Sequence, residues 1–119
     1  MQNLDQIQNE APILKKIVDL YKEYYLCLKT FPKKDQYMLG KKCEEYIVSF
    51  MELILSAVSS YKQEKKNKLL EANNKFDVLK VMIRMARELK MIDNKKYLKL
   101  EGQIQEIGRM LGGWIRSVT

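Results

Sequence analysis

The segment EIGRMLGGWIRS, residues 106–117, decides how the rest of the chain is organised. Its apolar residues recur at intervals of four, three and four through Val118, so they lie on one face of a helix. They are Ile107, Leu111, Trp114 and Val118. Gly108, Gly112 and Gly113 interrupt this helix, although an interior glycine costs about 0.5–1 kcal/mol relative to alanine. Gly108 and Gly112 are one turn apart, so we expect a backbone or a bulky side chain to pack closely on these two glycines. The alternative, a frayed end, is disfavoured by the large apolar surface of Trp114.

The composition indicates one folded, mostly helical domain. The chain has 119 residues, 46% of them hydrophobic, with only two prolines and five glycines. A chain of this size buries about two-thirds of its unfolded surface. No apolar run approaches the ~18 residues of a membrane span, and the N-terminal MQNLDQIQNEA lacks the pattern of a signal peptide. We expect a cytoplasmic protein with a polar leader at residues 1–11 and a single domain at residues 12–119.

The net charge of +7 is concentrated in the third quarter of the chain. Residues 62–92 carry nine basic and four acidic side chains, whereas residues 35–61 carry two and four. An excess of cations attracts polyanions through a sequence-independent, salt-sensitive interaction. Charge alone does not distinguish RNA or DNA from an acidic protein surface, so all three stay open as partners.

Apolar spacing predicts two helices in the first half of the chain. Pro12 opens the first, since proline is tolerated in the first turn, and Pro32 disfavours helical geometry in the residue before it. Asp35 is the predicted N-cap of the second helix, which continues to about Tyr61. Gly40 lies in the first turns of that helix, where a close neighbour or a slight irregularity would fit.

Two further helices are predicted in the second half. The charged segment Lys62–Lys68 is interpreted as a hinge into the third helix, which continues to about Ile92. Asp93 or Asn94 ends it and caps the fourth helix, which runs from Lys95 to about residue 118. Four amphipathic helices with short connections predict an all-α, antiparallel, up-down-up-down four-helix bundle.

The third helix carries two apolar stripes and an opposite cationic face. The second stripe makes the apolar arc wider than one bundle can cover, so we expect copies of the chain to associate through it. It includes Val78, Met82 and Met85. The cations Lys80, Arg84 and Arg87 follow i, i+4, i+7 spacing and project from one side, which also carries Lys66. Such a face is often only solvated surface, but the scarcity of acids near it favours binding of a polyanion.

The sequence offers no set of residues for catalysis. It contains no histidine, so the commonest general base and metal ligand is missing. The glycines follow no strand and lack the lysine and hydroxyl of a phosphate-binding loop. Cys27 and Cys43 lie in apolar helical patterns and are predicted to be reduced core residues. We therefore expect a protein that is not an enzyme and needs no metal or cofactor.

Three segments together closely resemble the Avd proteins, the accessory variability determinants of diversity-generating retroelements. This family is a group of four-helix bundles related to ribosomal-RNA intervening-sequence proteins. The segments are FPKKDQYMLGKK (31–42), VLKVMIRMARELKMIDNKKYLKL (78–100) and EIGRMLGGWIRS (106–117). The resemblance covers nearly the whole chain, from about Ile13 to Ser117, and GRMLGGW is its most specific part.

The resemblance implies a homopentameric barrel with a basic surface, which binds the reverse transcriptase of the retroelement and its template RNA or complementary DNA. In this role the protein is a non-catalytic subunit that supports mutagenic reverse transcription and retrohoming. By analogy, phosphate contacts would come from Lys66, Lys80, Arg84, Arg87, Lys90, Arg109 and Arg116. Subunit packing would use Gly108, Leu111, Gly112, Gly113 and Trp114 with the second stripe. The alternative is a structural oligomeric scaffold that binds an acidic protein partner.

Overall fold

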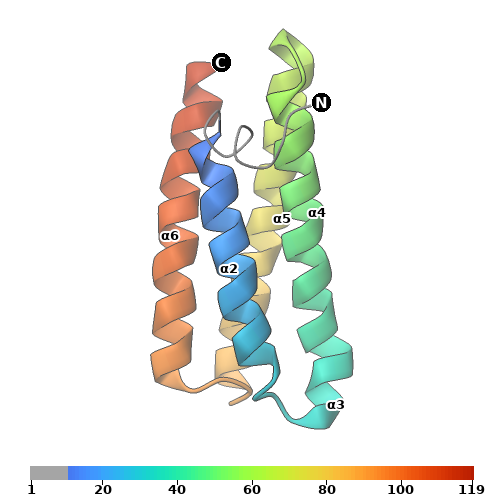
Figure 1. Cartoon of the computed structure of the whole chain (residues 1–119), viewed down its shortest axis with the longest axis vertical. Helices are drawn as coiled ribbons and strands as arrows, with labels where there is room; N and C mark the ends of the chain where they lie inside the picture. The colour runs from blue at the N-terminus through green and yellow to red at the C-terminus, as the bar shows by residue number, and fades with distance from the viewer. Residues whose placement is uncertain (1–10) are drawn as a thin grey trace.

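The computed structural model describes residues 11–119, so all of the predicted polar leader except Ala11 lies outside the described residues. Four long helices run alternately up and down in a bundle of 43 × 27 × 22 Å (Figure 1). They are α2 (Pro12–Leu28), α4 (Lys41–Val58), α5 (Lys62–Glu88) and α6 (Asn94–Ser117). Each packs against the next around the ring, and α6 closes it against α2. Residues 11–119 contain no strand, and the predicted all-α bundle is confirmed.

The core is built from the apolar faces that the spacing predicts. Phe50 of α4 stacks on Phe76 of α5 with ring centroids 4.7 Å apart, which ties the middle of the bundle together. Ile17 of α2 and Ile104 of α6 are fully buried in the same core. No helix of residues 11–119 is long and apolar enough to cross a membrane.

The boundary between the second and third predicted helices differs from the expectation. The segment Lys62–Lys68 is not a hinge: it forms the first two turns of α5. The true connection is the short segment Ser59–Tyr61, and α4 already ends at Val58. Tyr61, the predicted end of the second helix, is 82% exposed in this connection. Charged residues are good helix formers, so a polar run fits an exposed helix start as well as it fits a hinge.

The prediction that Asp35 caps the second helix is wrong. A short helical turn, α3 (Lys33–Asp35), starts after Pro32 and continues through the π-helical turn η1 (Gln36–Gly40) directly into α4. Asp35 has helical dihedral angles and makes no capping hydrogen bond. The proline starts the helix instead, because it fixes the backbone of the residue that precedes the first turn.

The turn between α5 and α6 is closed by hydrogen bonds at both helix ends. At the end of α5, the backbone N–H of Met91 donates to Ala86 O and that of Lys90 donates to Arg87 O. This is a Schellman motif with Lys90, at φ 61°, in the left-handed position where glycine is usual. At the start of α6 the carboxylate of Asp93 accepts from the backbone N–H of Lys96 at 2.8 Å. Asp93, one of the two predicted caps, is therefore the cap of α6.

Candidate nucleic-acid interface

Two of the predicted cations of α5, Arg87 and Lys80, lie on the flank of this helix that faces α6. The guanidinium of Arg87 lies 4.2 Å from the centroid of the Tyr97 ring on α6. The ammonium of Lys80 lies 5.4 Å from the centroid of the Phe76 ring, and Phe76 in turn faces Gly108 on α6. Both cations are therefore held beside the seam between α5 and α6.

These contacts also fix the register of the two antiparallel helices. With Arg87 opposite Tyr97 and Phe76 opposite Gly108, the start of α5 lies opposite the end of α6, which brings Lys66 to the level of Arg116. Because a helix rises about 1.5 Å per residue, the segment from Lys66 to Lys90 extends over about 35 Å. By this register Arg109 and Arg116 of α6 fall within the same span, so the predicted residues lie along the bundle rather than around a pocket. We call this set the α5–α6 cationic stripe: Lys66, Lys80, Arg84, Arg87, Lys90, Arg109 and Arg116.

Few carboxylates of the described residues neutralise this stripe. Lys80 forms an ion pair with Asp77 at 3.1 Å along α5. No other cation of the stripe is within ion-pair distance of a carboxylate of residues 11–119, and Arg84 and Arg109 are exposed. Glu101 follows Tyr97 by one helical turn, so it is the acid of α6 closest in position to this flank. The stripe therefore keeps most of its positive charge available to solvent.

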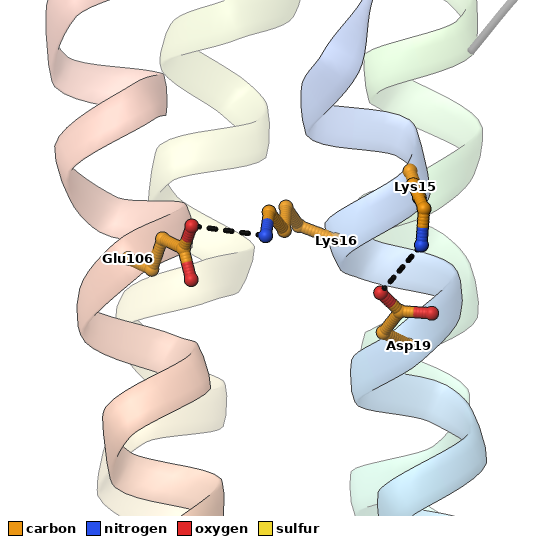
Figure 2. A network of polar contacts seen from close by, with 4 residues as sticks. All are labelled: Lys15, Lys16, Asp19 and Glu106. Atoms are coloured by element: carbon orange, nitrogen blue, oxygen red, sulfur yellow. Dashed lines mark hydrogen bonds and ion pairs between the residues drawn. The ribbon is translucent and has the colours of Figure 1, made fainter.

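The opposite flank of α6, which faces α2, is neutralised by ion pairs between the helices. Figure 2 shows Lys16 reaching from α2 to Glu106 on α6, where Nζ and Oε1 are 3.1 Å apart. Lys99 of α6 pairs with Glu23 of α2 at 2.9 Å. Ion pairs at the surface add little to stability. In each of these two pairs, however, a carboxylate offsets the charge of the lysine. The net positive charge is consequently displaced toward the α5 side of α6.

A comparison with protein families finds that residues 12–118 match the model of the bAvd-like family. The chain belongs to this family. The match includes all four long helices and confirms the predicted resemblance to Avd proteins. Membership indicates an accessory protein of a diversity-generating retroelement. A comparison with individually curated proteins finds no match.

The glycine-rich end of this bAvd-like chain is a regular helix. α6 continues to Ser117, so the frayed-end alternative is wrong. A methyl group added at Gly108 would lie 3.6 Å from Phe76 Cε2, an ordinary packing distance. At Gly112 and Gly113 it would meet only the guanidinium of Arg116, at 3.5 and 3.8 Å. Of the two glycines expected to be approached closely, Gly108 therefore has a bulky side chain beside it, whereas Gly112 meets no other element within the described residues of this chain.

Leu111 is fully buried, whereas Trp114 is only partly buried at the open end of the bundle. There it borders a cavity of about 360 Å³ together with Met110 and Val58. The second stripe of α5 is divided in a similar way. Met82 is buried in the core of the chain, while Val78 and Met85 are 41% and 42% exposed. Of these three residues of the second apolar stripe, only Val78 and Met85 are thus exposed for contact with another molecule.

The two cysteines of the bAvd-like chain lie inside the core. Cys27 and Cys43 are buried free thiols, as predicted. Burial raises the pKa of the Cys43 thiol to about 11, so it is protonated and poorly nucleophilic at neutral pH. Among residues 11–119 there is no group of three or more Cys, Asp or Glu residues arranged to hold a metal ion.

One surface was not identified from the sequence. The segment FPKKDQYMLGKK, interpreted as a connection and a helix start, presents four exposed lysines around two exposed apolar residues. The lysines are Lys33, Lys34, Lys41 and Lys42, and the apolar residues are Tyr37 and Met38. The sequence signal was the unusual pairing of two Lys-Lys doublets with apolar side chains that fit no core stripe.

Proposed function

We propose that this protein is a non-catalytic accessory subunit of a diversity-generating retroelement that binds the reverse transcriptase and nucleic acid. In this proposal the α5–α6 cationic stripe holds template RNA or complementary DNA during mutagenic reverse transcription. The observation that carries the proposal is the match of residues 12–118 to the bAvd-like family, combined with a cationic stripe that few carboxylates neutralise.

The shape of the stripe suits an extended polyanion. Its length of about 35 Å follows a helix axis, so several consecutive phosphates can each meet a lysine or arginine. Arginine adds a planar, multiply donating group that binds phosphate through two hydrogen bonds. Contacts of this kind carry no sequence information, which is appropriate for a subunit that must hold a template regardless of its sequence.

We further propose that several copies assemble, in line with the homopentamer expected from the resemblance. The exposed apolar residues Val78, Val81 and Met85 on α5 favour association, because they remain in water on a single bundle. An assembly would repeat the cationic stripe around its surface. A nucleic acid bound to one copy would then meet the next at high effective concentration, which raises avidity without any new type of contact.

The test replaces Lys80, Arg84 and Arg87 together with alanine. Binding of a fluorescent single-stranded RNA is followed by anisotropy across a salt titration. We expect weaker binding and a smaller slope of log K against log salt, by roughly 0.7 per lost phosphate contact on each copy that touches the strand. Alanine favours helix, Arg84 is exposed and Lys80 and Arg87 are part-exposed, so circular dichroism should show the same helix content. A melting curve reports any stability lost with the Arg87–Tyr97 contact.

The matched control replaces Lys15 and Lys22 of α2, together with Lys29 at its C-cap, by alanine. This variant loses the same number of charges from a surface outside the stripe. If it weakens RNA binding as much as the stripe variant, the binding depends on net charge and not on the stripe. Binding that is unaffected by the stripe variant would remove the proposed interface. Co-purification of each variant with the reverse transcriptase measures the second proposed interaction separately.

A further inference from the structure

A groove of about 800 Å³ opens at the end of the bundle where α3 and η1 pack beside the C-terminal end of α5. Its lining is rich in aliphatic and thioether side chains: Met38, Leu39, Met85, Leu89 and Met91. Several of these apolar side chains are largely exposed to solvent although they are large. Met38 is 63% exposed and Leu89 is 64% exposed, and Tyr37 at the edge is 72% exposed.

The π-helical turn explains why these side chains point away from the core. Gly40 is buried against Leu28 and Phe31, and its carbonyl oxygen accepts a hydrogen bond of 2.6 Å from Tyr24 Oη. This side of the turn is therefore fixed to α2. Tyr37 and Met38 lie on the other side, toward α5. A π-helical turn inserts one extra residue into a helix and is frequent at functional sites.

The rim of the groove is basic. Lys34 and Lys41 line it and have no carboxylate of residues 11–119 within ion-pair distance. Lys42 lies 3.8 Å from Glu45, a long and weak pair, and Asp35 is the other acid of the lining. Just outside the lining, the exposed Lys33 precedes Lys34 and the exposed Lys90 connects two lining residues of the α5–α6 turn. In the lining itself, three lysines thus stand against two carboxylates around the apolar side chains.

We propose that this groove binds an acidic, amphipathic helical segment of a partner protein. Apolar side chains of such a helix would insert between Met38, Met85 and Leu89, while its carboxylates would meet the lysines of the rim. Methionine suits this role because its flexible thioether side chain adapts to different apolar shapes. The charge complementarity also guides the approach of the partner and sets its orientation.

The same features disfavour two other occupants. Contact between copies is assigned to the neighbouring face of α5, where Val78 and Val81 lie outside the groove lining. A second copy in the groove itself would have to place its own acidic residues on the lysine rim, although each copy has a net charge of +7. A single-stranded nucleic acid stacks its bases on aromatic side chains, but the floor of the groove is aliphatic, and Tyr37 is the one aromatic residue in the lining. No arginine lines the groove either.

Apart from Lys90, which belongs to the cationic stripe and lies between two lining residues of the groove, the groove is separate from the stripe assigned to nucleic acid. Met85 and Leu89 project toward the α4 side of α5, where they meet residues of η1 and α4. Lys80 and Arg87 project toward α6, as their contacts with Phe76 and Tyr97 show. Variants of one surface can therefore be made without altering the other, and failure of one proposal leaves the other standing.

The probe is a fluorescein-labelled synthetic peptide of about four helical turns, with leucines at i, i+3, i+7 and i+11 and glutamates at most other positions. Its binding to the full chain is followed by anisotropy. The double variants Met38→Ser/Leu89→Ser and Lys34→Glu/Lys41→Glu should each weaken binding by about tenfold or more. All four positions are exposed, so circular dichroism and the melting curve should stay close to those of the parent.

The matched controls change similar residues outside the groove. Leu26→Ser/Leu98→Ser removes two leucines that are each 57% exposed on α2 and α6, and Lys22→Glu reverses one exposed charge on α2. We expect both to bind the peptide as the parent does. A peptide with its leucines replaced by serine should bind at least about tenfold more weakly to the parent.

Several results would overturn the proposal. The first is no binding of the peptide to the parent protein, or equal loss in groove and control variants. A second is a change in assembly mass by light scattering in the Met38→Ser/Leu89→Ser variant, because the groove would then be a contact between copies. A third is loss of RNA binding in the same variant together with displacement of the peptide by polyuridylate, which would assign the groove to nucleic acid.

Discussion

At the scale of single residues, Gly40 is the position with the least room for change. A Cβ atom there would lie 2.5 Å from Leu28 Cδ1 and 2.9 Å from the backbone oxygen of Asp35. The leucine can rotate, but the backbone oxygen belongs to the same helical turn and cannot move away easily. The sequence indicated a close neighbour or an irregularity at this glycine, and the structure shows both.

We expect Gly40→Ala to destabilise the protein by about 1–3 kcal/mol, the usual cost of overpacking. The gain in helix propensity from glycine to alanine, up to about 1 kcal/mol, offsets only part of this cost. Thermal and urea unfolding monitored by circular dichroism measure the difference. An unchanged midpoint would mean that the turn Gln36–Gly40 relaxes without cost.

Gly102 provides the matched control in a helix of the same protein. Its added Cβ atom would meet nothing within 4 Å, and it lies exposed inside α6. Gly102→Ala should therefore stabilise the protein, by about 0.5–1 kcal/mol, because helix propensity and the entropy of the unfolded chain both favour alanine. The two variants share the same chemical change and are expected to have opposite signs.

At the scale of helices, only one of the two aspartates predicted as N-caps accepts a capping hydrogen bond. Asp93 accepts a hydrogen bond from the Lys96 N–H and caps α6, whereas Asp35 lies within a continuous helix without such a bond. Asp93→Ala should cost about 0.5–2 kcal/mol, and Asp93→Asn should retain most of the stability.

Asp35→Ala is the control for this pair and should leave the free energy of unfolding nearly unchanged. Denaturant unfolding of the three variants checks the difference. Equal effects of Asp93→Ala and Asp35→Ala would show that the carboxylate charge matters and not the cap. The ion pair of Asp93 with Lys96, at 3.9 Å and exposed, contributes little in either case.

The helices themselves were predictable, because each carries a 3.6-residue apolar repeat that only a helix can bury on one side. The residues at which the helices begin and end were less predictable. A polar segment such as Lys62–Lys68 has no apolar repeat, and the sequence does not show whether it continues a helix or connects two. The structure extends α5 through it, since neighbouring contacts made by Leu69 and Ala72 fix the helix from the next turn onward.

At the scale of the whole molecule, the exposed apolar residues of α5 argue for self-association. Val78, Val81 and Met85 are between 41% and 55% exposed and follow helical spacing along one face. We expect light scattering to give a mass of several chains for the parent protein. Val81→Glu, at the most exposed of these positions, should shift the protein toward the monomer, since it would bury a charge in the contact.

Leu98→Glu is the matched control, because Leu98 is similarly exposed but lies on α6, away from this face. It should retain the assembly of the parent. A parent protein that is monomeric at micromolar concentration would contradict self-association. Loss of assembly in the Leu98 variant instead would place the contact on α6.

The sequence by itself determined the four helices, their buried faces and the family, because these follow from local apolar spacing and from short motifs such as GRMLGGW. It also located the cations of α5, but not their surroundings. Only the tertiary structure decided that Lys16 and Lys99 are paired across the α2–α6 seam while Arg84 and Arg109 are not. It also decided that η1 places Tyr37 and Met38 in the lining of a groove that has lysines at its rim. The physical reason is that ion pairing and exposure depend on which helix lies beside which, and a local repeat contains no information about its neighbour.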